Sequence, residues 1–165
     1  RIRPTKKVGQ TSIEWFNVEG QVQPRWKNQD EIKEINQIVQ GLTSSGFNYN
    51  TIGIVTPFRQ QANGIIESLA DNSVIIQGNE KIAVSTAHGF QGDEREIMIL
   101  SLVVGEEMPT GTVLWIHNQN NDSKNLLNVA LTRAKRKLYI VGNKDFCSRQ
   151  EGLLGALVTY VDELD

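Results

Sequence analysis

The sequence predicts an α/β protein in which helices cover both faces of a mostly parallel central sheet, in three layers. Short apolar runs with strand character alternate with segments whose apolar residues recur at helical intervals. Such alternation favours right-handed crossovers and a parallel sheet that is covered on both sides. The run Glu96–Val104 is the strongest strand, and its nearly continuous apolar character is typical of a strand buried at the middle of such a sheet.

The first half of the chain contains two predicted helices between short strands. Asn28 and Glu31 have the spacing of a capping box, and the helix that they begin is expected to close at Gly41 and Gly46. Thr56 and Pro57 then suit the N-cap and the first position of a second helix. The strands predicted around these helices cover residues 13–18, 51–56 and 82–86.

The second half is expected to continue the alternation after a polar segment. Residues 105–123, rich in Gly, Asn and Gln, are predicted to form a long loop or an edge hairpin. An apolar stripe over residues 126–134 indicates a helix, residues 138–141 a strand, and residues 153–161 a last helix. No internal repeat or domain boundary is found, so residues 1–165 are interpreted as one domain.

Composition excludes several classes of protein. The hydrophobic fraction of 39% and the charged fraction of 22% are ordinary for a globular protein. No apolar run approaches the roughly 18 residues that a membrane span requires, so we expect no membrane partner. Cys147 is the only cysteine, which rules out a disulfide framework and favours the cytoplasm. A net charge of −2 argues against bulk electrostatic coating of nucleic acid, although residues 133–137 form a local basic cluster.

Polar residues and glycines follow the strand predicted at residues 82–86. Thr86 and His88 could hold a phosphate, and Glu94 could accept hydrogen bonds from ribose hydroxyls. Gly89 and Gly92 would let the backbone approach a ligand closely. The alternative is an ordinary loop histidine beside a solvated acidic turn. We assign no magnesium to these acids, because they precede a strand instead of following one.

Two further positions could bind an anion. Thr56 and Pro57 would place a hydroxyl and free backbone N–H groups at the exit of a strand, unless they form a plain helix cap. Arg133 lies at the border of the apolar stripe of its helix, from where its guanidinium could reach outward to a γ-phosphate. A surface ion pair is the alternative for Arg133.

Missing motifs limit what this chain can do alone. No glycine is followed by lysine, so the phosphate-binding loop G-x-x-x-x-G-K-[ST] does not occur. No apolar strand ends in an acidic pair for magnesium, and no nucleophile–base arrangement is evident. The chain by itself is therefore not expected to hydrolyse ATP.

Three strings together resemble motifs IV, V and VI of superfamily 1 helicases. They are Thr-Pro-Phe-Arg-x-Gln at 56–61, Ser-Thr-Ala-His-Gly-Phe-Gln-Gly-Asp-Glu at 85–94 and Leu-Asn-Val-Ala-Leu-Thr-Arg-Ala at 127–134. They look most like the branch that contains the nonsense-mediated-decay helicase and its bacterial relatives. The resemblance covers essentially the whole chain as the second of two RecA-like motor domains.

The resemblance implies a role for each matching residue. Arg133 would be the arginine finger that senses the γ-phosphate, and Gly92 and Glu94 would contact the nucleotide. The other implied roles are a single-strand track lined by Thr56, Pro57, Thr86 and His88, and coupling of that track to the nucleotide by Gln91. His88 stands where some relatives have aspartate, and residues 105–123 have no familiar counterpart.

The implied activity belongs to a longer protein. ATP would bind between this domain and a first RecA-like domain, and the Mg²⁺ would be held mainly by residues of that first domain. Closure of the cleft between the two domains would move single-stranded DNA or RNA. The resemblance implies travel in the 5′-to-3′ direction. Two other interpretations stay open: a non-catalytic nucleic-acid-binding or interaction module, and a motor tethered to a nuclease or another effector.

Overall fold

A computed structural model describes residues 6–8, 11–86, 94–117 and 130–164 of the chain. The strands are β1 (Lys6–Val8), β2 (Thr11–Asn17), β3 (Val22–Gln23), β4 (Lys27–Asn28), β5 (Ile52–Thr56), β6 (Ile76–Gln77), β7 (Glu80–Lys81), β8 (Ala83–Thr86), β9 (Arg95–Ser101) and β10 (Ala134–Gly142). The helices are α1 (Gln29–Ser44), a 3₁₀ turn (Tyr49–Thr51), α2 (Arg59–Asp71), α3 (Thr110–His117), α5 (Lys144–Ser148) and α6 (Leu153–Glu163). Residues 130–133 are helical directly before β10.

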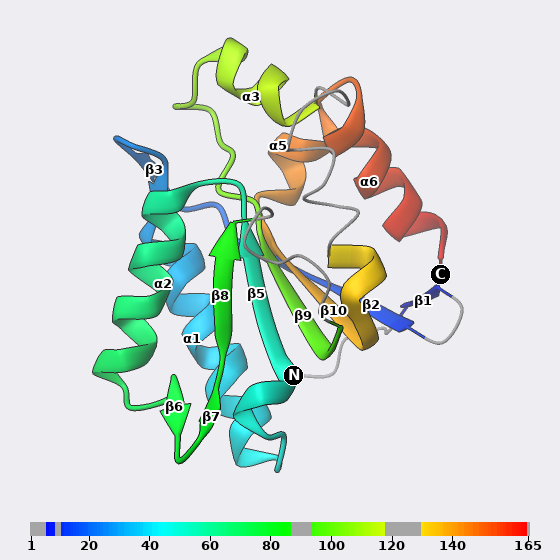
Figure 1. The fold of residues 1–165 in the computed structure, drawn as a ribbon. Coiled ribbons are helices and arrows are strands. Elements are labelled where there is room, and N and C mark those ends of the chain that lie inside the picture. Colours follow the sequence, from blue (N-terminus) through cyan, green and yellow to red (C-terminus); the bar gives the residue numbers. More distant parts are fainter. Residues whose placement is uncertain (1–5, 9–10, 87–93, 118–129, 165) are drawn as a thin grey trace.

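A six-stranded sheet in the order β1-β2-β10-β9-β5-β8 forms the middle layer. The five strands from β2 to β8 pair in parallel, and only β1 is antiparallel to its neighbour among the strands of this sheet that the structure describes. Helices α1 and α2 lie on one face, and α3, α5 and α6 lie on the other (Figure 1). This confirms the predicted fold class, a three-layer RecA-like α/β domain.

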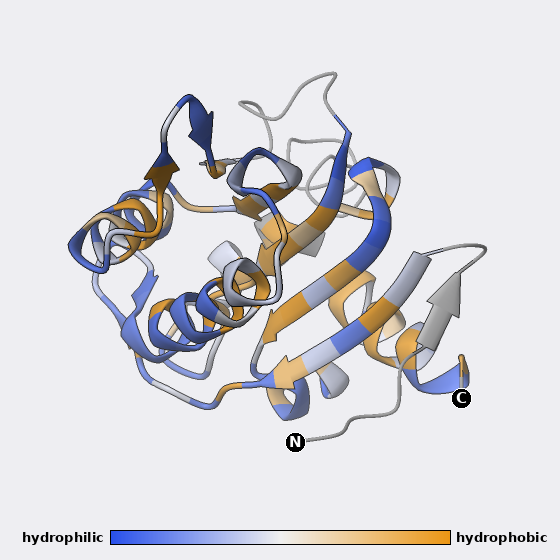
Figure 2. Ribbon diagram, turned by 90° about the horizontal axis from the view of Figure 1, so that it is seen from below, coloured by the Kyte–Doolittle hydropathy of each residue, from blue (hydrophilic) through white to orange (hydrophobic). Residues whose placement is uncertain are grey.

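Each face of the sheet has its own apolar core because successive strand residues point to opposite sides. In β9, Ile97 and Ile99 pack toward α1 and α2, whereas Met98 and Leu100 pack toward α5 and α6. All four side chains are fully buried, as predicted for the strand at the middle of the sheet. In Figure 2 hydrophobic residues face the interior of the layers, and hydrophilic residues lie mostly outside.

Helix α1 begins where the capping-box spacing predicts. The Asn28 side chain accepts a hydrogen bond from the Glu31 N–H at 3.0 Å, as an N-cap does. The reciprocal half of the box does not form, because the Asn28 N–H donates to Gln61 instead. At the other end, Gly41 lies inside the helix, which continues to Ser44, and Gly46 follows with φ of +98°.

Two helices were not predicted. Residues 110–117, interpreted from the sequence as loop or hairpin, form α3, and Lys144–Ser148 forms α5. Helix α3 contains glycine and β-branched residues, which have low helix propensity. Burial of Val113 and Ile116 against the α6 side of the core compensates for that low propensity.

Strand β10 contains a bulge at its start. Its pairing with β9 runs from Ala134 opposite Arg95 to Lys137 opposite Ile97, which is three residue steps on β10 against two on β9. One extra residue is therefore inserted among Lys135 and Arg136. Bulges of this kind bend a strand and change the direction of the side chains beside them.

Candidate functional site

The predicted strand-binding residues Thr56 and Thr86 lie side by side. They are the last residues of β5 and β8, and the register of these parallel strands pairs them directly. Both therefore lie at the carboxyl edge of the sheet, where open α/β sheets bind ligands. Thr56 is fully buried, and its hydroxyl has no hydrogen-bond partner among the described residues.

The expectation that Thr56 caps a helix is wrong. Helix α2 begins at Arg59, and its N-cap is Phe58, which has an extended backbone and no side-chain cap bond. Thr56 remains in the sheet, where it pairs with Thr86, and Pro57 and Phe58 lie between it and the helix. The first N–H groups of α2 nevertheless have no carbonyl inside the helix, so they stay suited to an anion. Pro57 is half-buried between the strand and this helix start.

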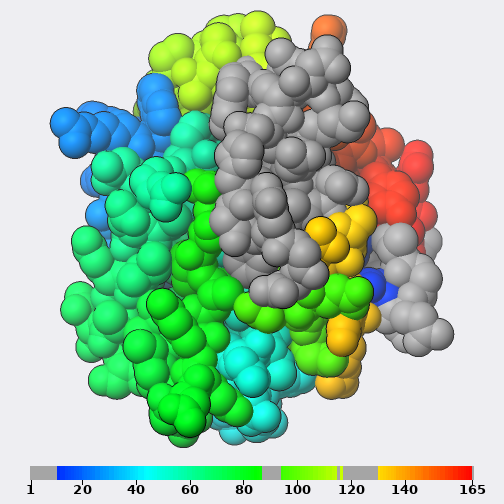
Figure 3. All heavy atoms as spheres, viewed as in Figure 1, coloured from blue at the N-terminus to red at the C-terminus, as the bar shows by residue number. Residues whose placement is uncertain are grey.

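The predicted nucleotide residues Glu94 and Arg133 lie together at the opposite edge. Glu94 directly precedes β9 and Arg133 directly precedes β10, and the first paired residues of these strands are Arg95 and Ala134. The seven residues of β9 span about 20 Å, so this amino edge is well separated from Thr56. In Figure 3 the start of β9 (green) and the segment after residue 130 (gold) adjoin on the molecular surface.

The amino edge carries several exposed charges. The closest oxygen of Glu94 lies 4.0 Å from the Lys135 Nζ, and that of Glu96 lies 3.9 Å from the Arg136 Nε. Arg133 is half-buried, and its Nε is buried without a hydrogen-bond partner in the described part of the chain. An unpaired buried donor on a permanently charged group is suited to receive an anion.

Four residues of the predicted glycine-rich segment cannot be placed. His88, Gly89, Gln91 and Gly92 lie outside the described residues. Of residues 87–94, the structure describes Glu94 alone. The proximity of this segment to Arg133 is therefore known for Glu94 and stays a prediction for the other residues.

Sequence reasoning missed a buried polar cluster behind the carboxyl edge. It consists of Asn28, Glu31, Gln61 and Ser101, each at most 1% exposed. The Ser101 hydroxyl donates to Glu31 at 2.8 Å and accepts from the Gln61 amide at 3.0 Å. One signal was present in the sequence: Glu31 lies four residues before Ile35, on the apolar side of α1.

Burial changes the titration of two groups near this cluster. Desolvation raises the pKa of Glu31 to about 8, although hydrogen bonds from Ser101 and Val103 act in the opposite direction. Burial also raises the pKa of the Cys147 thiol to about 12, and the nearby Glu31 carboxylate adds to this shift. Cys147 is thus an inert core residue and not a nucleophile.

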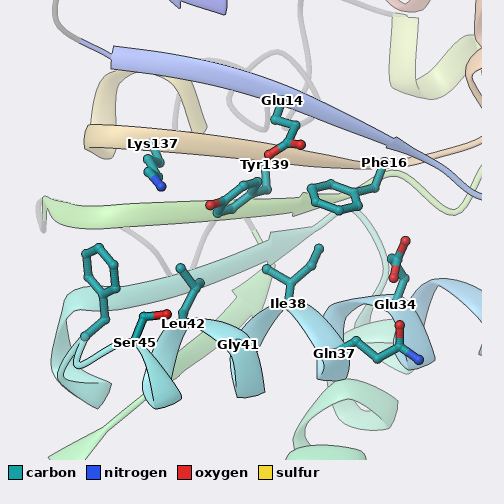
Figure 4. A pocket seen from close by; sticks show the side chains of 11 residues that line it. Glu14, Phe16, Glu34, Gln37, Ile38, Gly41, Leu42, Ser45, Lys137 and Tyr139 are labelled. Atoms are coloured by element: carbon teal, nitrogen blue, oxygen red, sulfur yellow. The ribbon is translucent and has the colours of Figure 1, made fainter. Parts of the chain in front are cut away.

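Two grooves among the described residues lie apart from Thr56 and Arg133. One, of about 590 Å³, lies between α1 and the strands β2 and β10, where Phe16 and Tyr139 meet edge to face (Figure 4). Another, of about 610 Å³, runs between α2 and β8 and reaches Ser85 and Arg95. Among the described residues no group of three His, Cys, Asp or Glu could hold a metal, and no helix has the length and apolar character of a membrane span.

A family model described as an AAA domain (AAA_12) matches residues 5–145, most of the chain. The chain belongs to this family. The family forms the C-terminal region of superfamily 1 helicases, so the resemblance of the three motifs is confirmed. The chain is thus a helicase-family domain with the fold of a second motor domain.

Relatives include a protein named as a DNA helicase and one named as a regulator of nonsense transcripts. The chain is 31% identical over 123 residues to the DNA polymerase alpha-associated DNA helicase A of Saccharomyces cerevisiae, covering 74% of this chain and 16% of that protein. It is 34% identical over 134 residues to the regulator of nonsense transcripts 1 homolog of Arabidopsis thaliana, covering 81% and 10%. The domain thus spans a small part of the length of these relatives.

Two further similarities were found. The DNA replication ATP-dependent helicase/nuclease JHS1 of Arabidopsis thaliana is 29% identical over 149 residues, covering 90% of this chain and 10% of that protein. A solved structure of the C-terminal domain of a "possible" DNA helicase from Lactobacillus has a TM-score of 0.44 at 12% identity, covering 81% of this chain and 73% of that one.

Proposed function

We propose that this domain is the second motor domain of an ATP-dependent helicase or translocase. It supplies an arginine finger to the nucleotide and part of the track for single-stranded nucleic acid. The observation that carries this proposal is the separation of the predicted residues into two edges of one sheet. Thr56 and Thr86 pair at the carboxyl edge, and Glu94 and Arg133 adjoin at the amino edge.

At the amino edge, Arg133 is the finger and Glu94 is a further nucleotide contact. Gly92 is assigned to the nucleotide as well. The planar fork of the Arg133 guanidinium matches phosphate oxygens. The unpartnered Nε of Arg133 fits this role, because a phosphate would satisfy a buried donor that the described residues leave unpaired. When bound, ATP supplies a γ-phosphate whose hydrolysis releases the free energy for movement. Mg²⁺ is held mainly by the first RecA-like domain.

At the carboxyl edge, Thr56, Pro57 and Thr86 line the strand track. His88 is assigned to the same track. Hydroxyl groups and free N–H groups at a helix start are typical contacts to phosphate and sugar, which position a strand without reading its sequence. The unpartnered hydroxyl of the buried Thr56 supports this role. Gln91, which lies between Thr86 and Glu94 in the sequence, couples the track to the nucleotide.

The sheet provides the mechanical link between the two edges. Strands β5, β9 and β10 are buried on both faces, so they move as one rigid body. When Arg133 draws this domain toward a nucleotide held by the first domain, the track residues at the other edge must shift with it. Repeated closing and opening then advances the domain along the strand.

Replacement of Arg133 tests the proposal in the helicase that carries this domain. We expect Arg133→Ala to lower kcat of strand-stimulated ATP hydrolysis by about 10³-fold or more, because a finger stabilises charge that develops in the transition state. Strand affinity, measured by fluorescence anisotropy with labelled DNA and RNA, should change much less. The same assay decides between DNA and RNA as the preferred track.

Arg149→Ala is a matched control for charge. Arg149 is an exposed arginine that pairs with Glu106 and Asp145 on the surface, and its loss should leave both measurements unchanged. Equal kcat in wild type and Arg133→Ala would refute the finger. If the wild-type protein binds strands without any ATP turnover, the non-catalytic module is the correct interpretation instead.

A further inference from the structure

The buried polar cluster joins the starts of two helices to the end of one strand. Gln61, in the first turn of α2, accepts from the Asn28 N–H at 2.9 Å, and its amide donates to the Ser101 hydroxyl at 3.0 Å. Asn28 in turn caps α1 through the Glu31 N–H. Ser101, the last residue of β9, therefore connects both helix starts through side chains that water does not reach.

Glu31 binds the backbone just after the end of β9, where the chain leaves the sheet. Its two carboxyl oxygens accept from the Val103 N–H at 3.0 and 3.1 Å, and one of them also accepts from Ser101. Val103 has a φ of +71°, a left-handed conformation that is a strong outlier for a β-branched residue. Such strain persists only where surrounding contacts enforce it, and the Glu31 carboxyl group is one of those contacts.

The cluster lies directly behind the carboxyl edge. The register pairs Val55 with Leu100, so the next residues, Thr56 and Ser101, end their strands side by side. Gln61 follows Thr56 by five residues, across Pro57 and Phe58. The backbone at Thr56 therefore lies between the hydrogen-bonded cluster on one side and the start of α2 on the other.

We propose that Glu31, Gln61 and Ser101 are positioning residues for the strand track: they lock the start of α2, with Thr56 and Pro57 ahead of it, against the end of β9. This inference rests on the proposed function for its effect on nucleic acid. It goes beyond that function because none of these three side chains is assigned a contact with nucleotide or strand. They act through the backbone of residues 56–59.

The same pair of helices offers a matched control. Asn36, in the middle of α1, is also buried and donates to the Ser68 hydroxyl and carbonyl of α2, at 2.8 and 3.1 Å. Asn36→Ala therefore removes a buried polar link between α1 and α2 that is remote from the carboxyl edge. Ser101→Ala removes the link at the edge. Thermal melting establishes that both variants fold and measures the stability that each loses.

Two measurements in the helicase that carries this domain separate positioning from stability. Ser101→Ala should speed amide hydrogen exchange in a peptide covering residues 56–62 and raise the strand concentration for half-maximal ATPase by roughly tenfold or more, since small misplacements are costly. At saturating strand, kcat should stay within about twofold. Asn36→Ala should change neither measurement. Glu31→Gln, which keeps the shape and most bonding capacity of Glu31, should restore near wild-type strand affinity where Glu31→Ala loses it.

The outcomes are distinct. If exchange in residues 56–62 is the same in Ser101→Ala and Asn36→Ala, the positioning role is overturned. The role is equally overturned if strand affinity falls only in proportion to the lost stability in both variants. If exchange increases in Ser101→Ala alone but the wild-type protein binds no strand, the lock stands and the proposed helicase function fails.

Discussion

The two edges of the sheet differ in how their proposed functional residues are held. At the carboxyl edge, Thr56 is fully buried and backed by the equally buried Gln61 and Ser101. At the amino edge, the Lys135 and Glu94 side chains are 52% and 56% exposed, and their contact is a loose ion pair. One edge is thus set in the core, and the other projects into solvent.

This difference predicts how the edges respond to change. Substitutions at the carboxyl edge alter packing and buried hydrogen bonds, so they affect stability together with strand binding. Substitutions of surface charges at the amino edge change the stability little. Their main effect should therefore be on nucleotide binding and hydrolysis. A motor gains from this arrangement, because the track needs fixed geometry whereas the finger must meet a ligand on another domain.

The largest effect on stability is expected from pH at Glu31. Its pKa rises from 4.5 to about 8 on folding, so the folded state holds a proton that the unfolded state releases between these values. The free energy of unfolding should therefore fall by about 1.4 kcal/mol per pH unit across this window and level off above it. Urea unfolding at several pH values measures the slope.

Glu31→Gln should flatten this slope, because an amide does not titrate. Glu67→Gln, which changes an exposed acid on α2, should leave the slope as in wild type. A Glu31→Gln protein with the full wild-type slope would show that burial does not control this carboxyl group. The carboxyl edge would then lose its main distinction from the amino edge.

A smaller and opposite effect is expected from Thr56→Val. Valine keeps the shape of threonine but removes a buried hydroxyl that has no partner in the described part of the chain. The free energy of unfolding should rise by about 1–3 kcal/mol, while strand affinity falls. Thermal melting and anisotropy titration measure the two quantities. A valine variant that loses stability and keeps strand affinity would contradict the assignment of Thr56 to the track.

The smallest change in stability is expected at the amino edge. Among the described residues, Glu94→Gln breaks the 4.0 Å contact with Lys135, so the free energy of unfolding should change by less than about 1 kcal/mol. The KM for ATP should nevertheless increase. Glu96→Gln, which breaks a similar contact with Arg136, is the control that should leave KM unaltered. Equal KM values in both variants would remove Glu94 from the nucleotide site.

Local sequence signals predicted the framework well where they agreed with the packing. The apolar run of β9 predicted its central place, and Asn28 predicted the start of α1. The prediction failed at Thr56 because cap chemistry and strand pairing compete for that residue, and the pairing with Thr86 prevails. It failed at α3 because only tertiary burial stabilises a helix with so little intrinsic propensity.

The motifs of the candidate site could be predicted from the sequence, but the buried residues that support it could not. The strings around Thr56, Thr86, Glu94 and Arg133 were found in the sequence, whereas Glu31 was interpreted only as part of a helix cap. Its real partners, Ser101 and Val103, are at least 70 residues away along the chain. No local pattern encodes such a contact. The positions of His88, Gln91 and Gly92 stay predictions.

The bulge at the start of β10 has a consequence for the finger. Side chains alternate between the two faces of a strand, so a one-residue change of register transfers every earlier side chain to the other face. Deleting Lys135 or Arg136 would erase the inserted residue and rotate Ala134 out of its core. The short helix that carries Arg133 would then meet the sheet in a different register, and the place of Arg133 beside Glu94 would change although neither residue had been replaced.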